Sequence, residues 1–274
     1  MAGPRQRYGR ANLVMNVPDI GPPVPARSHR IEPVLSVEEA DGLPALELSD
    51  RFDPFLPHFI RETLRGGGEA SIVREGPRAV ALWLSDPMER AASLFTRSGE
   101  VVEDLLASRP PTPFYCELDL PRRRERFDLY ARDLDPTLGA HRFRHRIRVA
   151  QPDELSRVRD LTREAWGPVN DRWFSGFAAR PEACFVAEVE SELVGVAWAT
   201  ALGIHGRLHS LSVRPGYRRL GIGTDLLFAR LLWLERQGVR DALSEISEHN
   251  AASRAVAERA GMRPVGWIYL YSKG

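Results

Sequence analysis

Apolar and polar residues alternate most clearly in the second half of the chain. Residues 208–213 alternate with no glycine or proline among them, which predicts a short strand. Pro215 and Gly216 end that strand, and residues 224–237 follow with leucines at helical spacing. The other elements predicted in this half are strands at 143–149, 183–190, 193–202, 241–247 and 265–271 and helices at 153–166, 172–179 and 251–260. Strands that alternate with helices favour an α/β fold with a mixed, partly parallel sheet.

From residue 30 onward the same pattern occurs twice. Arg30-Ile31 and Arg146-Ile147 each begin a strand-like segment, at an offset of 116 residues. Residues 90–99 and 207–216 share Arg, Ser, Leu, Arg and Gly in register. An internal repeat of this kind indicates two copies of one supersecondary unit.

The repeat predicts the domain organisation. We expect one unit at 30–140 and a second at 141–274, after an extended proline-containing arm at 1–29. The first unit lacks several residues between Gly99 and Asp104, where the second has its glycines and arginines. Only the second unit is therefore expected to carry a ligand-binding loop.

Composition limits the functional classes. The formal net charge of +1 over 274 residues gives no overall field for nucleic acid or an anionic membrane. No apolar run is long enough to span a bilayer, so we expect a cytoplasmic protein. Two cysteines, Cys116 and Cys184, are too few for a disulfide framework and have no metal-ligand spacing. We therefore expect neither nucleic acid nor membrane as a partner and no metal, while a homodimer stays open.

The segment between the 208–213 strand and the following helix predicts an anion site. Gly221 and Gly223 have no side chain to keep a ligand from the backbone N–H groups, and the N-terminus of a helix attracts negative charge. Arg218 and Arg219 add positive charge, so a diphosphate fits. A Walker loop is excluded because no Lys-Ser/Thr pair follows the last glycine. A dinucleotide fingerprint is excluded because Leu226 stands where a third small residue is needed.

The Arg-x-x-Gly-x-Gly sequence of residues 218–223, preceded by Leu211-Ser-Val213-x-Pro215, resembles motif A of the GNAT superfamily of acyl-CoA-dependent N-acetyltransferases. The resemblance implies a GNAT-like fold, which the repeat predicts to be duplicated, and acetyl-CoA as co-substrate. It also implies that the backbone N–H groups of Leu211 and Val213 bind the thioester and pantetheine. The residues that it assigns to the loop that binds the coenzyme A diphosphate are Arg218, Arg219, Leu220, Gly221, Ile222, Gly223 and Thr224.

A second segment extends the resemblance. Asn250 lies at the start of a predicted helix and eleven residues before Gly261, where the family has an asparagine that binds the pantetheine arm. Asn250 and Ser253 are therefore assigned to cofactor binding, although Asn250 also suits a helix cap. Many members have a tyrosine seven residues after this asparagine as general acid, and this chain has Ala257 there.

The candidate catalytic base is His209. Residues 208–213 read Leu-His-x-Leu-x-Val, which resembles a strand of the arylalkylamine N-acetyltransferases whose histidine helps to deprotonate the amine. An alkylammonium must lose its proton before it attacks a thioester, and a histidine side chain, which titrates near pH 6.5, can accept it through water. Glu245 competes for this role, together with Ser247 and His249.

These features predict an acyltransferase, an N-acetyltransferase that moves the acetyl group of acetyl-CoA directly to an amine of a small molecule or peptide. The absence of the tyrosine favours one alternative, a non-enzymatic acyl-CoA-binding or regulatory protein.

Overall fold

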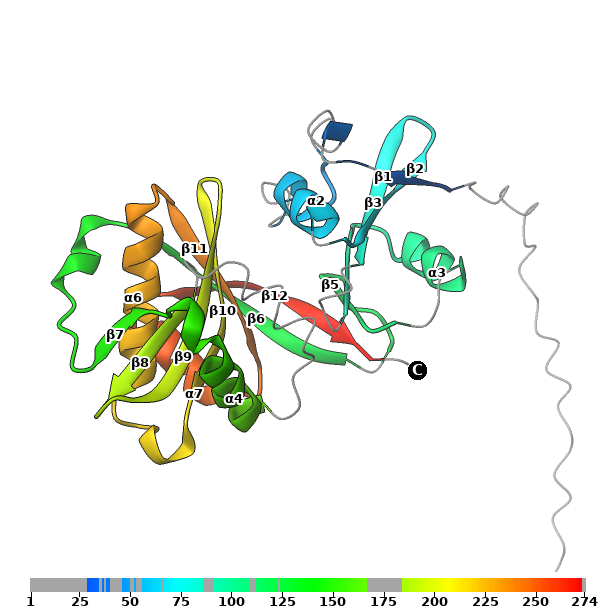
Figure 1. Cartoon of the computed structure of the whole chain (residues 1–274). Coiled ribbons are helices and arrows are strands. Elements are labelled where there is room, and N and C mark those ends of the chain that lie inside the picture. Colours follow the sequence, from blue (N-terminus) through cyan, green and yellow to red (C-terminus); the bar gives the residue numbers. More distant parts are fainter. Residues whose placement is uncertain are drawn as a thin grey trace, which may run out of the picture.

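The computed structural model describes residues 29–34, 36, 38–39, 46–49, 52, 56–65, 67–85, 91–108, 112–122, 124–166 and 184–272. The extended arm expected at 1–29, apart from His29, and the helix expected at 172–179 lie outside these ranges. Figure 1 shows the two halves of the chain on either side of a shared central group of strands.

The strands of the described residues form one twelve-stranded sheet in the order β1-β2-β3-β4-β5-β12-β6-β11-β10-β9-β8-β7. They are β1 Arg30–Val34, β2 Glu69–Glu75, β3 Arg78–Ser85, β4 Ala92–Thr96, β5 Phe114–Cys116, β6 Arg124–Asp133, β7 Arg146–Val149, β8 Cys184–Val189, β9 Glu192–Leu202, β10 His205–Val213, β11 Asp241–Ser247 and β12 Arg263–Tyr271. The α-helices are α2 Leu56–Arg65, α3 Gly99–Ser108, α4 Leu155–Trp166, α6 Ile222–Arg236 and α7 Ala251–Arg259, and short 3-10 helices cover Pro136–Ala140, Pro152–Glu154 and Pro215–Tyr217.

The two halves have the same strand pairing. From β1 to β4 each strand is antiparallel to the next, and β4 then pairs with β5 in parallel. From β7 to β10 the pairs are again antiparallel, and β10 pairs with β11 in parallel. Each half also has a helix after its fourth strand, α3 after β4 and α6 after β10. The duplicated pattern in the sequence therefore corresponds to a duplicated strand arrangement.

The strands that close the two halves are exchanged. β6 precedes the whole second half in the sequence, yet it lies between β11 and β12. β12, the last strand of the chain, pairs on its other side with β5. Figure 1 shows β12 and β6 side by side, joining the two halves. Each half therefore depends on backbone hydrogen bonds to a strand from the other half of the sequence.

Helices cover both faces of the sheet, because alternate side chains of a strand point to opposite faces. One face packs against α2 and α4, and the other packs against α3, α6 and α7. In β9, for example, Trp198 belongs to the cluster with α4, while Ala197 and Ala199 belong to the cluster with α6. We call these the α4 face and the α6 face.

The predicted elements of the second half agree closely with the structure. The strand at 241–247 is confirmed, and the strand expected at 208–213 begins earlier, at His205. Its first three residues pair with β9 through a tight hairpin, which the sequence pattern did not reveal. The helix expected from Thr224 begins at Ile222. None of the described helices is long and apolar enough to cross a membrane.

Candidate active site

β10 contains a bulge beside the predicted base. His209 pairs with Trp198 of β9 and Ser212 pairs with Val196, so two residues of β10 oppose one of β9. Ser210, inside the bulge, has a φ of 57°, which is unusual for a residue other than glycine. A bulge bends its strand and changes the direction of the groups that follow it.

Beyond the bulge, β10 separates from β11. These parallel strands pair only through the first three residues of each, at His205, Gly206 and Arg207. The N–H of Arg214 donates to the carbonyl of Val194 in β9, and successive N–H groups of a strand point in opposite directions. The N–H of Val213 therefore faces the open side, as does that of Leu211. These are the two backbone groups that the sequence assigned to the thioester and pantetheine.

The loop before α6 presents backbone N–H groups to the same region. Arg219 and Gly221 have φ values of 66° and 96°, and Gly221 is the N-cap of α6 without a side-chain cap. Within the described residues, the N–H groups of residues 219–223 have no hydrogen-bond acceptor. Five N–H groups at the positive end of a fifteen-residue helix form a site that suits a diphosphate. The N–H of Thr224 is not part of it, because that group donates to the carbonyl of Gly221.

The side chains of the loop have different environments. Arg218 and Arg219 are exposed, and the Nε of Arg218 donates to the carbonyl of Val213 at 3.0 Å. Leu220 is exposed, while Ile222, the first residue of α6, is buried in the core. Leu220 and Ile222 can therefore contribute only their backbone N–H groups to an anion.

A buried carboxylate, which the sequence analysis did not single out, anchors the start of α6. Asp225 accepts hydrogen bonds from ring nitrogens of His141 at 2.9 Å and His145 at 2.7 Å, and from the N–H groups of Arg144 and His145. Burial raises the pKa of the Asp225 carboxyl, but these hydrogen bonds outweigh burial and hold the pKa below its usual value. The Cε1 of His145 lies 3.9 Å from the position that a Cβ on Gly221 would take, so this cluster also supports the loop.

A buried arginine lies behind the bulge. Arg230 of α6 is 3% exposed and donates to the carbonyls of Trp198 at 3.0 Å and His209 at 3.2 Å. Among the described residues no carboxylate lies within ion-pair distance, and burial lowers the pKa of Arg230 to about 9. The guanidinium therefore stays charged at neutral pH and ties α6 to both strands at the bulge. A signal was present in the sequence, because Arg230 interrupts the apolar face of the helix between Leu227 and Leu234.

The predicted base and its competitor lie on the α4 face, opposite the loop. His209 is partly buried, with Nε2 at 3.2 Å from Thr200 Oγ1 and Nδ1 at 3.1 Å from Ser210 Oγ. Glu245 is partly buried as well, and accepts from Arg207 Nε at 3.1 and 3.3 Å. The predicted anion loop thus lies at the opening between β10 and β11 on the α6 face of the sheet. His209 and Glu245 lie at the same opening on the α4 face.

Asn250 lies at the start of α7, after the end of β11. Its side-chain oxygen accepts from the N–H of Ser253 at 3.1 Å, which makes Asn250 the N-cap of α7. Among the described residues, the side-chain NH₂ group of Asn250 has no hydrogen-bond acceptor, so it can donate to a ligand. Ala257, at the position of the family's tyrosine, is 2% exposed and packs in the core around α6.

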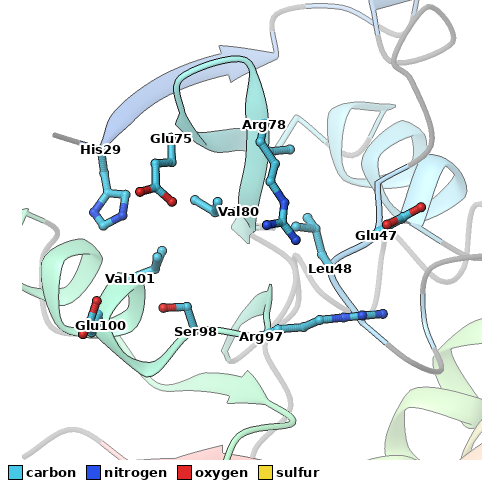
Figure 2. A pocket seen from close by; sticks show the side chains of 11 residues that line it. His29, Glu47, Leu48, Glu75, Arg78, Val80, Arg97, Ser98, Glu100 and Val101 are labelled. Carbon is cyan, nitrogen blue, oxygen red and sulfur yellow. The ribbon is translucent and has the colours of Figure 1, made fainter. Parts of the chain in front are cut away.

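The corresponding position in the N-terminal half has no such loop. Only Arg97 and Ser98 separate β4 from α3, whereas residues 214–221 separate β10 from α6. Figure 2 shows a cavity beside this connection that is open to solvent. Its charged lining residues are Glu47, Glu75, Arg78, Arg97 and Glu100. Three carboxylates among them disfavour a diphosphate, and the absence of coenzyme A from this half stays a prediction.

Comparison with known proteins identifies the family of the second half. Residues 148–262 match the model of the acetyltransferase (GNAT) family. No curated protein sequence matches the chain.

Several solved structures share the fold across most of the chain. A GCN5-related N-acetyltransferase from Sphaerobacter thermophilus is 20% identical with a TM-score of 0.56, over 74% of this chain and 79% of that one. A tandem GNAT protein from the clavulanic acid biosynthesis pathway is 16% identical with a TM-score of 0.59, over 90% and 98%. A Drosophila protein is 14% identical with a TM-score of 0.65, over 89% and 99%.

The tandem protein is matched over nearly its whole length, so the likeness in fold includes the N-terminal half. Residues 148–262 of this chain therefore belong to the GNAT family of acetyltransferases, within a whole-chain fold of the GNAT type.

Proposed function

We propose that the protein is an acetyl-CoA-dependent N-acetyltransferase that transfers the acetyl group directly to an amine of a small molecule or peptide. One observation carries the proposal. The N–H groups of residues 219–223, which have no acceptor among the described residues, and the predicted base His209 lie on opposite sides of one opening in the sheet.

The residues present fit coenzyme A. The N–H groups at the start of α6, with Arg218 and Arg219, would bind its diphosphate, and the amide of Asn250 would bind the pantetheine arm. The N–H groups of Leu211 and Val213, which have no partner in β11, would bind the thioester end. An acetyl group held there would be reached by an acceptor on the α4 face.

The chemistry needs one proton acceptor and stabilisation of one oxyanion. His209, acting directly or through water, would take a proton from the ammonium form of the acceptor, and the free amine would attack the thioester carbon. Backbone N–H groups of β10 would stabilise the negative charge on the thioester oxygen. A C–N bond forms, the C–S bond breaks and coenzyme A leaves as a thiolate. A thiol with a pKa of about 8.5 can leave at neutral pH without a dedicated acid, so Ala257 does not prevent turnover.

Calorimetry and an activity assay test the proposal. Wild-type protein should bind one acetyl-CoA per chain and release coenzyme A thiol when a panel of primary amines is added. Gly221→Glu should abolish binding, because its carboxylate would occupy the anion site and repel the diphosphate. Gly99→Glu is the matched control, since Gly99 begins α3 in the N-terminal half and a side chain there meets nothing within 4 Å.

Unchanged affinity in Gly221→Glu would refute the assignment of the loop. Binding of acetyl-CoA with no thiol release for any amine would instead support the alternative, an acyl-CoA-binding or regulatory protein, which the missing tyrosine favours.

A further inference from the structure

The strand exchange places a carboxylate from the first half of the chain beside the active site of the second half. Ser247, the last residue of β11, is paired with Phe127 of β6, and Glu125 lies two residues further along β6. The hydroxyl of Ser247 donates to the Glu125 carboxylate across 122 residues of sequence. Glu125 is therefore fixed at the end of β11 that lies on the wide side of the opening.

Glu125 faces the α4 face of the sheet, where the acceptor would bind. Phe127 and Leu129 of β6 pack in the cluster against α2, and Glu125 continues this alternation. Ser247 continues the alternation of Glu245, whose carboxylate contacts Arg207 on the same face. This is the face opposite the diphosphate loop.

The charge of Glu125 is not balanced by the described residues. The nearby carboxylate of Glu245, on the same face, forms an ion pair with Arg207, whereas Glu125 has no such cation among the described residues. Glu125 is partly buried, and among the residues that the structure describes only the neutral hydroxyl of Ser247 contacts its carboxylate. A partly buried carboxylate without a cation is unfavourable, and a positively charged ligand group would relieve that cost.

Strand geometry shows that Glu125 is too far from His209 to hold the reacting nitrogen. β6, which carries Glu125, is the second strand from β10, which carries His209. Along the strand direction, Glu125 lies four residues beyond the level of His209. With strands about 4.8 Å apart and a rise of about 3.3 Å per residue, the two Cα atoms are roughly 16 Å apart. Side chains on one face extend in the same direction, so their ends stay roughly 16 Å apart. With a hydrogen bond of about 2.9 Å at each end, the two nitrogens of the acceptor would be roughly 10 Å apart, the length of an extended eight-carbon diamine.

We propose that Glu125 binds a second, non-reacting cationic group of the acceptor, so that the preferred acceptor is a diamine or another amine with two positive charges. This inference rests on the proposed function. It gives the exchange of β6 a functional consequence, because the strand from the first half supplies the specificity of the site in the second half.

The test compares 1,8-diaminooctane with 1-aminooctane. Wild-type protein should acetylate the diamine with a kcat/KM at least tenfold higher than the monoamine. Glu125→Gln keeps the shape and the hydrogen bond from Ser247 but removes the charge, so it should lose this preference and leave the monoamine rate unchanged. Glu69→Gln on β2 is the matched control and should keep the preference.

Each outcome decides the inference. Equal loss for both amines in Glu125→Gln, or an unchanged preference, overturns it while the proposed function stands. If no amine is acetylated, the proposed function fails and calorimetry with 1,8-diaminooctane decides. Binding to the acetyl-CoA-loaded wild type that weakens at least tenfold in Glu125→Gln supports the cation site, and equal or absent binding overturns it.

Discussion

Replacement of Gly223 by alanine should make the protein more stable and a poorer binder of acetyl-CoA. Gly223 is the second residue of α6, and a Cβ there would lie 3.7 Å from Leu211 Cδ2 and Val256 Cγ2, which is ordinary contact. Alanine is favoured over glycine in a helix by about 1 kcal/mol. The free energy of unfolding should therefore rise by about 0.5–1 kcal/mol, and Tm by about 2 °C for a chain of this size.

The affinity for acetyl-CoA should fall although the stability rises. The Cα–Cβ bond of a helical residue tilts towards the N-terminus, so the new methyl group, in contact with Leu211 and Val256, would lie beside the first N–H groups of α6 and crowd the diphosphate. Loss or lengthening of one hydrogen bond to a charged group costs about 1.5–3 kcal/mol, which raises the Kd for acetyl-CoA about 10- to 100-fold.

Thermal melting without ligand and titration calorimetry measure the two effects separately. Gly99→Ala, at the start of α3, is the matched control and should raise Tm without changing the Kd. Gly221→Ala should lower both stability and affinity, because the φ of 96° is unfavourable for alanine by about 1–2 kcal/mol. Wild-type affinity in Gly223→Ala would show that the start of α6 does not bind the diphosphate.

Three further predictions concern the base, the strand exchange and an ion pair. His209→Ala should lower kcat at neutral pH about 100-fold with little change in acetyl-CoA affinity, and wild-type rates from about pH 6 to 9 would move the role to Glu245. An isolated 141–274 fragment lacks β6, which leaves β11 and β12 without their shared neighbour, so it should aggregate on expression; a soluble, active fragment would contradict this. Glu154 accepts two hydrogen bonds from Arg148, and these lower the pKa of its carboxyl from 4.5 to about 2. The lowered pKa contributes up to about 3 kcal/mol to the free energy of unfolding. This contribution is complete above pH 4.5 and is lost as the pH falls through 2. Denaturant unfolding of Glu154→Gln should show a deficit at pH 7 that shrinks towards pH 2, and a constant deficit would refute the linkage.

The sequence by itself determined the local features. Periodicity placed β11 and, to within a few residues, β10, α6 and α7, because each pattern reports which side of one element faces the core. The glycines at 221 and 223 predicted an anion loop because their effect on the backbone is local, and the binding of an anion there stays a prediction. The catalytic roles of His209 and Glu245 remain predictions. The structure adds that both side chains lie on the α4 face of the sheet.

Only the tertiary structure decided which distant segments meet. The alternating pattern of β6 suits a place beside any antiparallel neighbour, so nothing in the sequence showed that it lies between β11 and β12. The same holds for Asp225, whose two histidines precede it by 80 residues or more, and for the contact of Ser247 with Glu125 across 122 residues. Sequence spacing reports neighbours along one helix or strand, whereas these contacts depend on the register between strands and on the packing of a helix against the sheet.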